Sequence, residues 1–293
     1  MTTPGQDERR TFALDAGCVS LPRRPRDSHK GDYGRVLIVG GSVGYTGAPN
    51  LAAAAAVRAG AGLVYLGVPD AIWTVCAVKN TEAMPFPLPC DDRGLLTADA
   101  LSGLRERWDA MDVLALGPGL GRSEGTAALT RAVIEGFPGK LVLDADALWA
   151  AAREPDMLRA ASGRTVITPH AGEFARLGGA ITGERVRDAS AFADEYGCVT
   201  VLKGAGTVVA FPGGDRYVLH AGNPGMAKGG SGDVLTGITA AMLGQLPWEQ
   251  AVLIAVWLHS AAADKCAAQR GEYGMIPSDI IEALPYIMKE ITK

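Results

Sequence analysis

The chain has 293 residues, of which 48% are hydrophobic and 20% are charged, with a formal net charge of -4 and a pI of about 5.6. This length and apolar content predict a sizeable core, and the slightly acidic balance provides no basic field to gather nucleic acid or anionic lipid. The five cysteines are scattered and never spaced as C-x-x-C. This pattern indicates a reducing compartment and argues against a structural zinc site. The polar N-terminus has no signal-peptide core and no uncharged apolar run reaches membrane-spanning length, so we expect a cytoplasmic protein that binds small molecules.

The predicted elements alternate along the chain. Residues 1–29 are a polar lead-in, and residues 30–293 are predicted to form a single domain. Short apolar runs predict strands at 36–39, 63–68, 113–116, 141–143, 165–168 and 199–202. Helical patterns follow at 49–60, 97–108, 124–135, 145–152, 172–177 and 184–196.

The remaining third of the chain begins with a predicted hairpin at 207–219, placed near one edge of the sheet. Helices are predicted at 233–243, 248–269 and 277–289. Strands that alternate with helices and read as continuous apolar runs are typical of a parallel sheet covered on both faces. The sequence therefore predicts a three-layer α/β/α sandwich with a mainly parallel central sheet.

Polar or glycine-rich clusters follow five of the predicted strands, at residues 40–49, 117–122, 144–146, 168–173 and 203–207. Open α/β sheets bind ligands at the carboxyl ends of their strands, and glycine lets the backbone approach a ligand closely. Glycine loops also arise from tight strand-to-helix packing alone. The placement of the clusters is therefore more informative than any one of them.

Three of these clusters carry side chains that suit chemistry. Asp144 and Asp146 can contact a metal or a sugar hydroxyl, or can cap a helix. His170 lies three residues before Glu173, a pair that can address substrate and magnesium together, although His170 also fits a hydrogen-bonded loop position. Residues 203–207 combine a lysine, two glycines and a threonine, a set that suits phosphate or adenosine but also fits the start of a hairpin.

The strongest signal lies at residues 222–233, where five glycines precede the predicted helix. Uncovered backbone amides and the positive end of a helix dipole favour a bound anion. Asp233 lies in the first turn, where its carboxylate would repel a polyphosphate, so a role in reaction explains it better than a role in binding. His259, on an apolar helical face, is predicted to be a core histidine whose hydrogen bonds are satisfied.

Several catalytic motifs are missing. The sequence has no G-x-x-x-x-G-K-S/T P-loop, no H-E-x-x-H, no G-x-S-x-G and no G-x-G-x-x-G after the first strand. The late glycine-rich segment with its aspartate, and the Thr168–Glu173 stretch in place of a T-P-N-x-x-E motif, resemble the ribokinase-like superfamily of small-molecule kinases. His170 stands where that motif has asparagine. With this change, the clusters at 41–49, 117–121, 144–148, 168–173, 203–207 and 223–233 are together similar to the ADP-dependent NAD(P)H-hydrate dehydratase family, over residues 30–290.

The resemblance implies a repair reaction. The S-epimer of NADH or NADPH hydrated at C6 of the nicotinamide ring would be dehydrated at the expense of ADP, giving NAD(P)H, AMP and phosphate. Hydroxide is a poor leaving group, and phosphorylation converts its elimination into loss of phosphate. The N-terminal epimerase domain that many members carry does not fit in 29 residues, so the resemblance implies a stand-alone dehydratase, and it also implies a homotetramer.

The resemblance also implies residue roles. Asp233 would be the general base, and the amides of Gly230, Ser231 and Gly232 would form an anion hole for the transferring phosphoryl group. Magnesium would bridge the phosphates and reach Glu173 through water. Ala48, Gly119, His170 and Asp233 would bind the hydrated dinucleotide, and the adenine nucleotide would contact Lys203, Gly204, Ala205, Gly206, Thr207 and Gly232.

Two alternatives remain. An ATP-dependent kinase of a hydroxyethylthiazole- or hydroxymethylpyrimidine-type alcohol would use the same glycine-rich segment, but His170 and the 45–48 loop argue against it. A non-catalytic nucleotide sensor would tolerate loss of the base, yet Asp233 is present together with its complete anion hole. The sequence leaves open the choice between NADH and NADPH hydrates, between ADP and ATP, and the roles of Asp144 and Asp146.

Overall fold

The computed structural model of the chain describes residues 9–293, so the part of the expected lead-in over 1–8 lies outside the described residues. The strands are β1 (Thr11–Ala13), β2 (Arg35–Val39), β3 (Leu63–Pro69), β4 (Met84–Leu88), β5 (Val113–Leu116), β6 (Lys140–Leu143), β7 (Thr165–Ile167), β8 (Val199–Leu202), β9 (Thr207–Ala210) and β10 (Arg216–Leu219). The α-helices are α1 (Gly47–Arg58), α2 (Asp70–Lys79), α3 (Ala100–Trp108), α4 (Glu124–Gly136), α5 (Ala145–Ala151), α6 (Ala171–Arg176), α7 (Arg185–Tyr196), α8 (Ser231–Gln245), α9 (Trp248–Gly274) and α10 (Pro277–Ile291).

The ten strands of the described residues form one sheet in the order β1-β10-β9-β8-β7-β6-β5-β2-β3-β4. Every pairing is parallel except those of β9, which runs antiparallel to both β8 and β10. The β9–β10 hairpin lies one strand from the β1 edge, which confirms its expected position. The order reverses between β2 and β5, and ligands bind at such a switch point in open α/β sheets.

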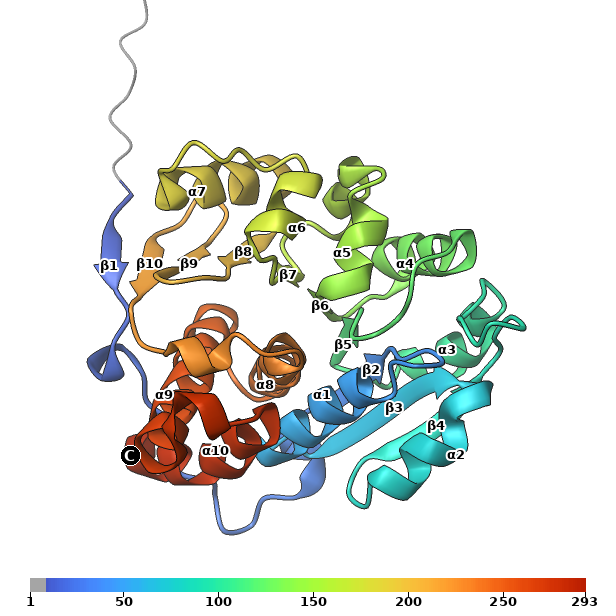
Figure 1. The fold of residues 1–293 in the computed structure, drawn as a ribbon, viewed down its shortest axis with the longest axis horizontal. Coiled ribbons are helices and arrows are strands. Elements are labelled where there is room, and N and C mark those ends of the chain that lie inside the picture. The colour runs from blue at the N-terminus through green and yellow to red at the C-terminus, as the bar shows by residue number, and fades with distance from the viewer. Residues whose placement is uncertain (1–8) are drawn as a thin grey trace, which may run out of the picture.

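The side chains of the strands alternate between two apolar layers, one on each face of the sheet. Figure 1 shows helices along both faces. Val36 and Ile38 of β2 pack with α1, α8, α9 and α10, while Leu37 and Val39 pack on the side that carries α3, α4, α5 and α7. Such strands are buried on both faces, which is why each reads as a continuous apolar run. The expected three-layer α/β/α fold is confirmed.

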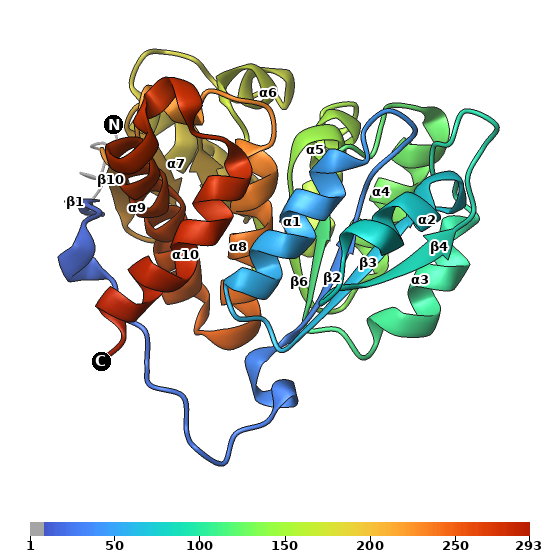
Figure 2. The ribbon, with the colours of Figure 1, turned by 60° about the horizontal axis from the view of Figure 1, so that its bottom comes forward.

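The longest helix, α9, is a core helix. By length and composition it is apolar enough to cross a membrane, but 67% of its most apolar window is buried in the molecule. It packs between α8 and α10, and Figure 2 shows these three helices together beside α1.

Three elements were not anticipated. β1 lies inside the expected lead-in, yet it pairs in parallel with β10, and Leu14, Val19 and Leu21 behind it are buried. From residue 11 the lead-in is therefore part of the folded unit rather than a solvated tail. The other two, α2 and β4, cover the opposite edge of the sheet.

Helices α1 and α8 touch through their backbones at Gly237, where a Cβ atom would lie 2.1 Å from the Ala52 carbonyl oxygen. We expect Gly237→Ala to lower the free energy of unfolding by about 1–3 kcal/mol, because the two helices must separate. Chemical denaturation measures this loss. Gly274→Ala is the control, since a Cβ atom there meets nothing within 4 Å; equal stability of both variants would contradict the close contact.

Candidate active site

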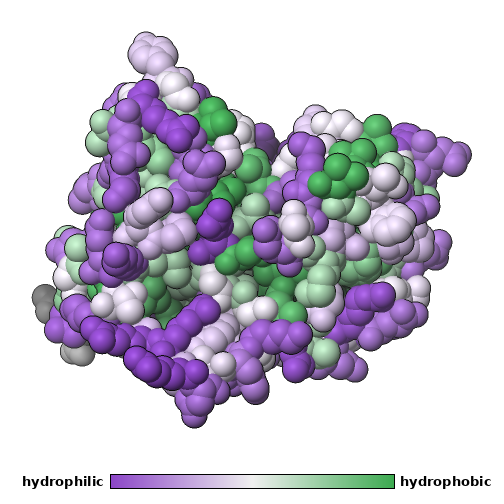
Figure 3. Space-filling model, turned by 90° about the horizontal axis from the view of Figure 1, so that it is seen from below, coloured by the Kyte–Doolittle hydropathy of each residue, from purple (hydrophilic) through white to green (hydrophobic). Residues whose placement is uncertain are grey.

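The predicted site residues gather at the carboxyl ends of the parallel strands. Figure 3 shows the face that carries α1, α9 and α10, and its upper rim is hollowed between two lobes. Ala48 lies in the first turn of α1, which follows β2, and Gly119 follows β5, so both lie at the switch point. A Cβ atom on Gly119 would lie 3.1 Å from the Ala48 Cβ and 2.9 Å from the Tyr45 carbonyl oxygen. The fold therefore brings together two residues that are 71 positions apart in the sequence.

The glycine-rich segment ends at the N-terminus of α8 as expected. Gly230 is the N-cap in the left-handed conformation (φ 102°), and no side chain caps the first turn among the described residues. The Ser231 amide donates to the Lys228 carbonyl at 3.3 Å, whereas the amides of Gly230 and Gly232 have no acceptor in the described chain. The Ser231 hydroxyl is also buried there and finds no hydrogen-bond partner within residues 9–293. These donors fit an anion that approaches the helix end.

His259 contacts this helix end from α9. It is buried, as expected, with 7% exposure, and burial lowers its pKa to about 4, although a hydrogen bond with the Ser231 backbone works in the opposite direction. The imidazole is therefore neutral at physiological pH. The expectation of fully satisfied hydrogen bonds was wrong for one atom, because Nε2 has no partner among the described residues.

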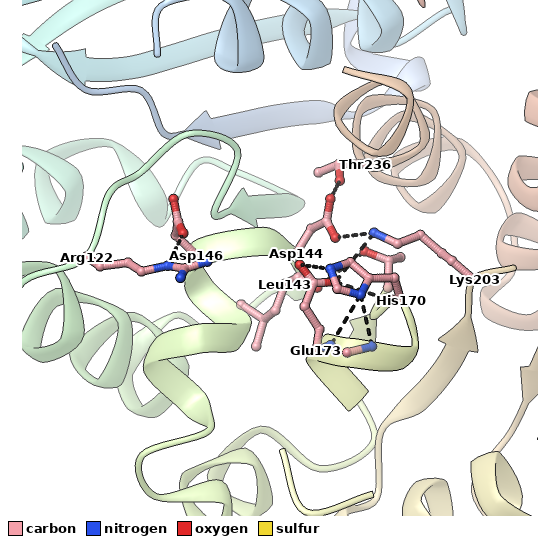
Figure 4. A network of polar contacts seen from close by, with 10 residues as sticks. Arg122, Leu143, Asp144, Asp146, His170, Glu173, Lys203 and Thr236 are labelled. Atoms are coloured by element: carbon pink, nitrogen blue, oxygen red, sulfur yellow. Dashed lines mark hydrogen bonds and ion pairs between the residues drawn. The ribbon is translucent and has the colours of Figure 1, made fainter. Parts of the chain in front are cut away.

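His170 and Glu173 lock together at the start of α6 (Figure 4). His170 Nδ1 accepts hydrogen bonds from the amides of Gly172 (3.0 Å) and Glu173 (3.3 Å), and the His170 amide donates to Glu173 Oε2 at 2.9 Å. Nδ1 accepts from these amides, Nε2 lies 3.4 Å from Glu173 Oε1, and 55% of the His170 side chain is exposed. The ring is thus both a helix cap and a surface that a ligand can reach.

Asp144 was left without a role by the sequence, and the structure places it at the centre of the polar network in Figure 4. Its side chain is 2% exposed, and Lys203 Nζ lies 2.8 Å from Oδ1. The Thr236 hydroxyl, on α8, donates to Oδ2 at 2.8 Å. Burial alone would raise the pKa of Asp144, but the Lys203 charge and the hydrogen bonds from Lys203, Thr236 and Thr168 outweigh it and hold the pKa below its usual value. Thr236 was missed because a threonine inside a helix carries no sequence signal.

Asp146 belongs to a different group. It accepts a hydrogen bond from the Gly121 amide at 2.9 Å and pairs with Arg122 at 2.8 Å. It therefore fixes the loop that contains Gly119, and of the two carboxylates only Asp144 enters the network around Lys203.

Lys203 connects the remaining predicted residues. Its amide donates to the Pro169 carbonyl at 2.8 Å, which sets β8 beside the His170 segment, and its ammonium lies 3.8 Å from Glu173 Oε2. A Cβ atom on Gly232 would lie 3.3 Å from Lys203 Nζ. Burial would lower the lysine pKa, but Asp144, Glu173 and Asp233 together raise it above its usual value, so the ammonium stays charged. The other end of the loop closes by a hydrogen bond from the Thr207 hydroxyl to the Gly204 carbonyl at 3.0 Å.

Asp233 is a largely buried carboxyl group whose pKa moves in the opposite direction to that of Asp144. Burial, followed by the charge of Asp144, raises its pKa from 3.8 to about 7, although Lys203 opposes the shift. A carboxylate poised near neutrality, beside a fixed ammonium and free amides, has the properties of a general base for an attack on a phosphoryl group.

Comparisons with known proteins agree with this geometry. A family model described as NAD(P)H-hydrate dehydratase matches residues 36–286. The chain belongs to the NAD(P)H-hydrate dehydratase family. It is 46% identical over 288 residues to the bifunctional NAD(P)H-hydrate repair enzyme Nnr of Moorella thermoacetica, covering 96% of this chain and 54% of the relative. It is 42% identical over 279 residues to the Escherichia coli enzyme of the same name, covering 92% of this chain and 50% of that protein.

This member of the family thus spans about half the length of the curated relatives it matches. Among solved structures, the ADP/ATP-dependent NAD(P)H-hydrate dehydratase of Bacillus subtilis, co-crystallised with ATP and Mg²⁺, superposes with a TM-score of 0.78 and 29% identity, covering 96% of this chain and 98% of that one. A ribokinase-like superfamily protein of Enterococcus faecalis superposes with a TM-score of 0.84 and 27% identity, covering 100% and 99% of the two chains. A hydroxyethylthiazole kinase of Pyrococcus horikoshii has a TM-score of 0.56 at 16% identity, which shows the shared fold alone.

Proposed function

We propose that this chain catalyses the ADP-dependent dehydration of the S-epimer of NADH or NADPH hydrate to NAD(P)H, with AMP and phosphate as products. The observation that carries the proposal is the position of Asp233. Its carboxyl group, with a pKa near 7, lies in the first turn of α8 next to uncapped amides and to the Lys203 ammonium. The bifunctional repair enzymes and the B. subtilis dehydratase named above support the choice of substrate.

In the proposed reaction, the C6 hydroxyl of the hydrate attacks the terminal phosphoryl group of ADP, and Asp233 takes the hydroxyl proton. AMP leaves as the bond to the bridging oxygen breaks. Loss of phosphate from C6 and of a proton from C5 then restores the ring double bond. The amides of Gly230 and Gly232 and the Ser231 hydroxyl would hold the phosphoryl oxygens, and Lys203 would balance their charge.

We assign the adenine nucleotide to Lys203, Gly204, Ala205, Gly206, Thr207 and Gly232, and the hydrated dinucleotide to Ala48, Gly119, His170 and Asp233. Lys203 and Gly232 lie side by side, and so do Ala48 and Gly119, which supports one continuous site. The pairing of Asp146 with the Gly121 amide holds the loop that carries Gly119.

The donor set fits a magnesium ion that is held mainly by phosphates. Among the described residues, no group of three or more His, Cys, Asp or Glu side chains is arranged to bind a metal. Mg²⁺ commonly binds through one or two carboxylates, several waters and substrate phosphates, so Glu173 would reach it through water. When bound, the ion would supply further neutralisation of the phosphate charge.

The test is incubation of the protein with hydrated NADPH and Mg²⁺, in parallel with ADP and with ATP. We expect absorbance at 340 nm to rise only when a nucleotide is present, with release of AMP when the nucleotide is ADP. The control offers a thiazole or pyrimidine alcohol instead of the hydrate. Phosphorylation of that alcohol without any rise at 340 nm would replace our proposal by the vitamin-precursor kinase.

A homotetramer and a cytoplasmic location complete the proposal. Exposed apolar side chains on α2 support an association surface, because Trp73, Val75 and Val78 are 39%, 45% and 82% exposed. Light scattering of the purified chain at several concentrations tests this part, and a monomer at all of them would contradict it.

A further inference from the structure

Asp144 joins three elements that are distant in the sequence. It directly follows β6, and its two carboxylate oxygens take different partners: Lys203 from the end of β8 and Thr236 from the second turn of α8, each at 2.8 Å (Figure 4). Thr236 lies one helical turn after Asp233, on the same side of α8 as Gly232. The carboxylate therefore ties the lysine to the helix whose N-terminus forms the anion hole.

The backbone around Asp144 is closely held. Ala145 has a φ of 48°, the only positive value at a non-glycine residue in the described chain. A Cβ atom on Gly117 would lie 1.8 Å from the Asp144 carbonyl oxygen, so the chain after β5 presses directly against this peptide. A sparsely populated backbone conformation persists only where its surroundings enforce it, and such positions cluster at functional sites.

We propose that Asp144 is the positioning residue of this site, which holds the Lys203 ammonium against the first turn of α8 where the transferring phosphoryl group is received. The proposal rests on the proposed function. Free lysine side chains sample many rotamers. An ion pair selects one of them when the carboxylate is buried and its other oxygen is held by a second partner. Without Asp144, the carboxylate that remains within ion-pair distance of the ammonium among the described residues is that of Glu173, 3.8 Å away on α6 rather than on α8.

The variant Asp144→Asn separates positioning from simple electrostatics. Removal of a negative charge from an anion site favours nucleotide binding, so charge alone predicts a lower KM for ADP and no fall in turnover. A misplaced lysine predicts instead that kcat falls about 10- to 100-fold, because a shift of about 1 Å in a catalytic group has effects of this size. We expect the fall in kcat, with the KM for ADP unchanged or lower.

The pH profile gives a second readout that a merely structural role would not move. The groups that act on Asp233 are Asp144 and Asp146 at the start of α5 and Lys203 at the end of β8, while the buried His259 of α9 is neutral. Because the Asp144 charge raises the pKa of Asp233, we expect the acidic limb of kcat to move to lower pH in Asp144→Asn. An NMR titration of the Asp233 carboxyl carbon follows the same shift without turnover.

Two further variants complete the experiment. Thr236→Val leaves the ion pair in place but removes the link to α8, so kcat should fall less than in Asp144→Asn, and Thr236→Ser should restore it. Asp188→Asn is the matched control, since Asp188 is a buried carboxylate (5% exposed) of α7 that accepts two hydrogen bonds from Thr182. It should leave kcat and the pH limb unchanged.

Unchanged kcat in Asp144→Asn, or full rescue of its loss by raised Mg²⁺, would overturn the proposal, and rescue by Mg²⁺ would make Asp144 a metal ligand. If the wild-type chain does not dehydrate the hydrate, the proposed function fails, but a crystal structure of Asp144→Asn with ADP still tests the positioning role. Displacement of Lys203 from the helix end supports it, and an unmoved ammonium contradicts it. Should Asp144→Asn not fold, the Thr236→Val and Thr236→Ser pair decides by the same kcat comparison.

Discussion

Replacement of Asp233 by asparagine is expected to lower turnover by about 10²- to 10⁴-fold while the nucleotide still binds, because the variant keeps the shape of the side chain but cannot accept the hydroxyl proton. Binding of ADP should be equal or tighter, since a carboxylate no longer faces the phosphates. Steady-state kinetics with the hydrate and calorimetry with ADP measure the two quantities separately. Turnover equal to wild type would contradict the base role, and it would leave a nucleotide sensor as the better explanation.

The same variant should be more stable than wild type above neutral pH. Burial raises the pKa of Asp233 to about 7 in the folded chain, whereas an unfolded chain ionises near 3.8. The ionised carboxylate therefore destabilises the fold, and wild-type stability falls as the pH rises from about 4 to about 7. Asparagine removes this dependence, so loss of activity together with gain of stability at pH 8 excludes unfolding as the cause. In the wild type, kcat should rise with pH through the pKa of this group.

Replacement of Lys203 by methionine is expected to remove activity and to lower the free energy of unfolding by about 3–5 kcal/mol at pH 7, because the buried Asp144 charge loses its ion-pair partner. Asp144 is 2% exposed and keeps only hydroxyl partners. Urea denaturation measures the loss. Lys140→Met is the control. The Lys140 ammonium donates to the Leu243 carbonyl at 2.7 Å, so its removal leaves no buried carboxylate without an ion-pair partner.

The pH dependence of Lys203→Met has a definite sign. In the wild type the Asp144 pKa is lowered, so its stabilising effect is present above the unfolded pKa and is lost as the pH falls through the folded value. Without the lysine, burial raises this pKa instead, and the deficit should shrink as the pH falls and Asp144 takes up a proton. Adding Asp144→Asn to Lys203→Met should recover part of the stability at pH 7; a strictly additive double variant would show that the two side chains are not coupled.

The candidate site could be predicted from the sequence in its parts but not in its connections. The clusters after β2, β5, β6, β7 and β8 were found because the carboxyl ends of parallel strands share one edge of a sheet. The different partners of Asp144 and Asp146 could not be predicted, because the two carboxylates are only two positions apart in the sequence. In the structure, Asp144 pairs with Lys203 and Asp146 pairs with Arg122. The partner of Asp144 on α8 is 92 residues away and has no motif.

The fold was predicted where apolar runs are continuous and was missed where they are interrupted. β4 reads Met-Pro-Phe-Pro-Leu, and its two prolines argue against a strand in general, yet they are tolerated at an edge, where one row of amides faces no partner. α2 is rich in β-branched and aromatic residues and shows no clear amphipathic period. β1 has only three residues, so long-range pairing rather than local propensity decides its conformation.

The pairing of β1 with β10 has a consequence for any version of this chain that is shortened from the N-terminus toward residue 36, where the match to the family model starts. A version that begins near residue 30 would lack β1 and leave the β10 edge unpaired. Tyr217 would also lose the stacked ring of Phe12, whose centroid lies 5.4 Å from its own. Unpaired, partly apolar edge strands pair with strands of other chains, so the shortened protein would be prone to aggregate during expression. The tether of Leu21 to Ile291 and Lys293 would go as well, freeing the end of α10. A poor yield of the shortened protein would then indicate the loss of the edge strand β1 and would say nothing about catalysis.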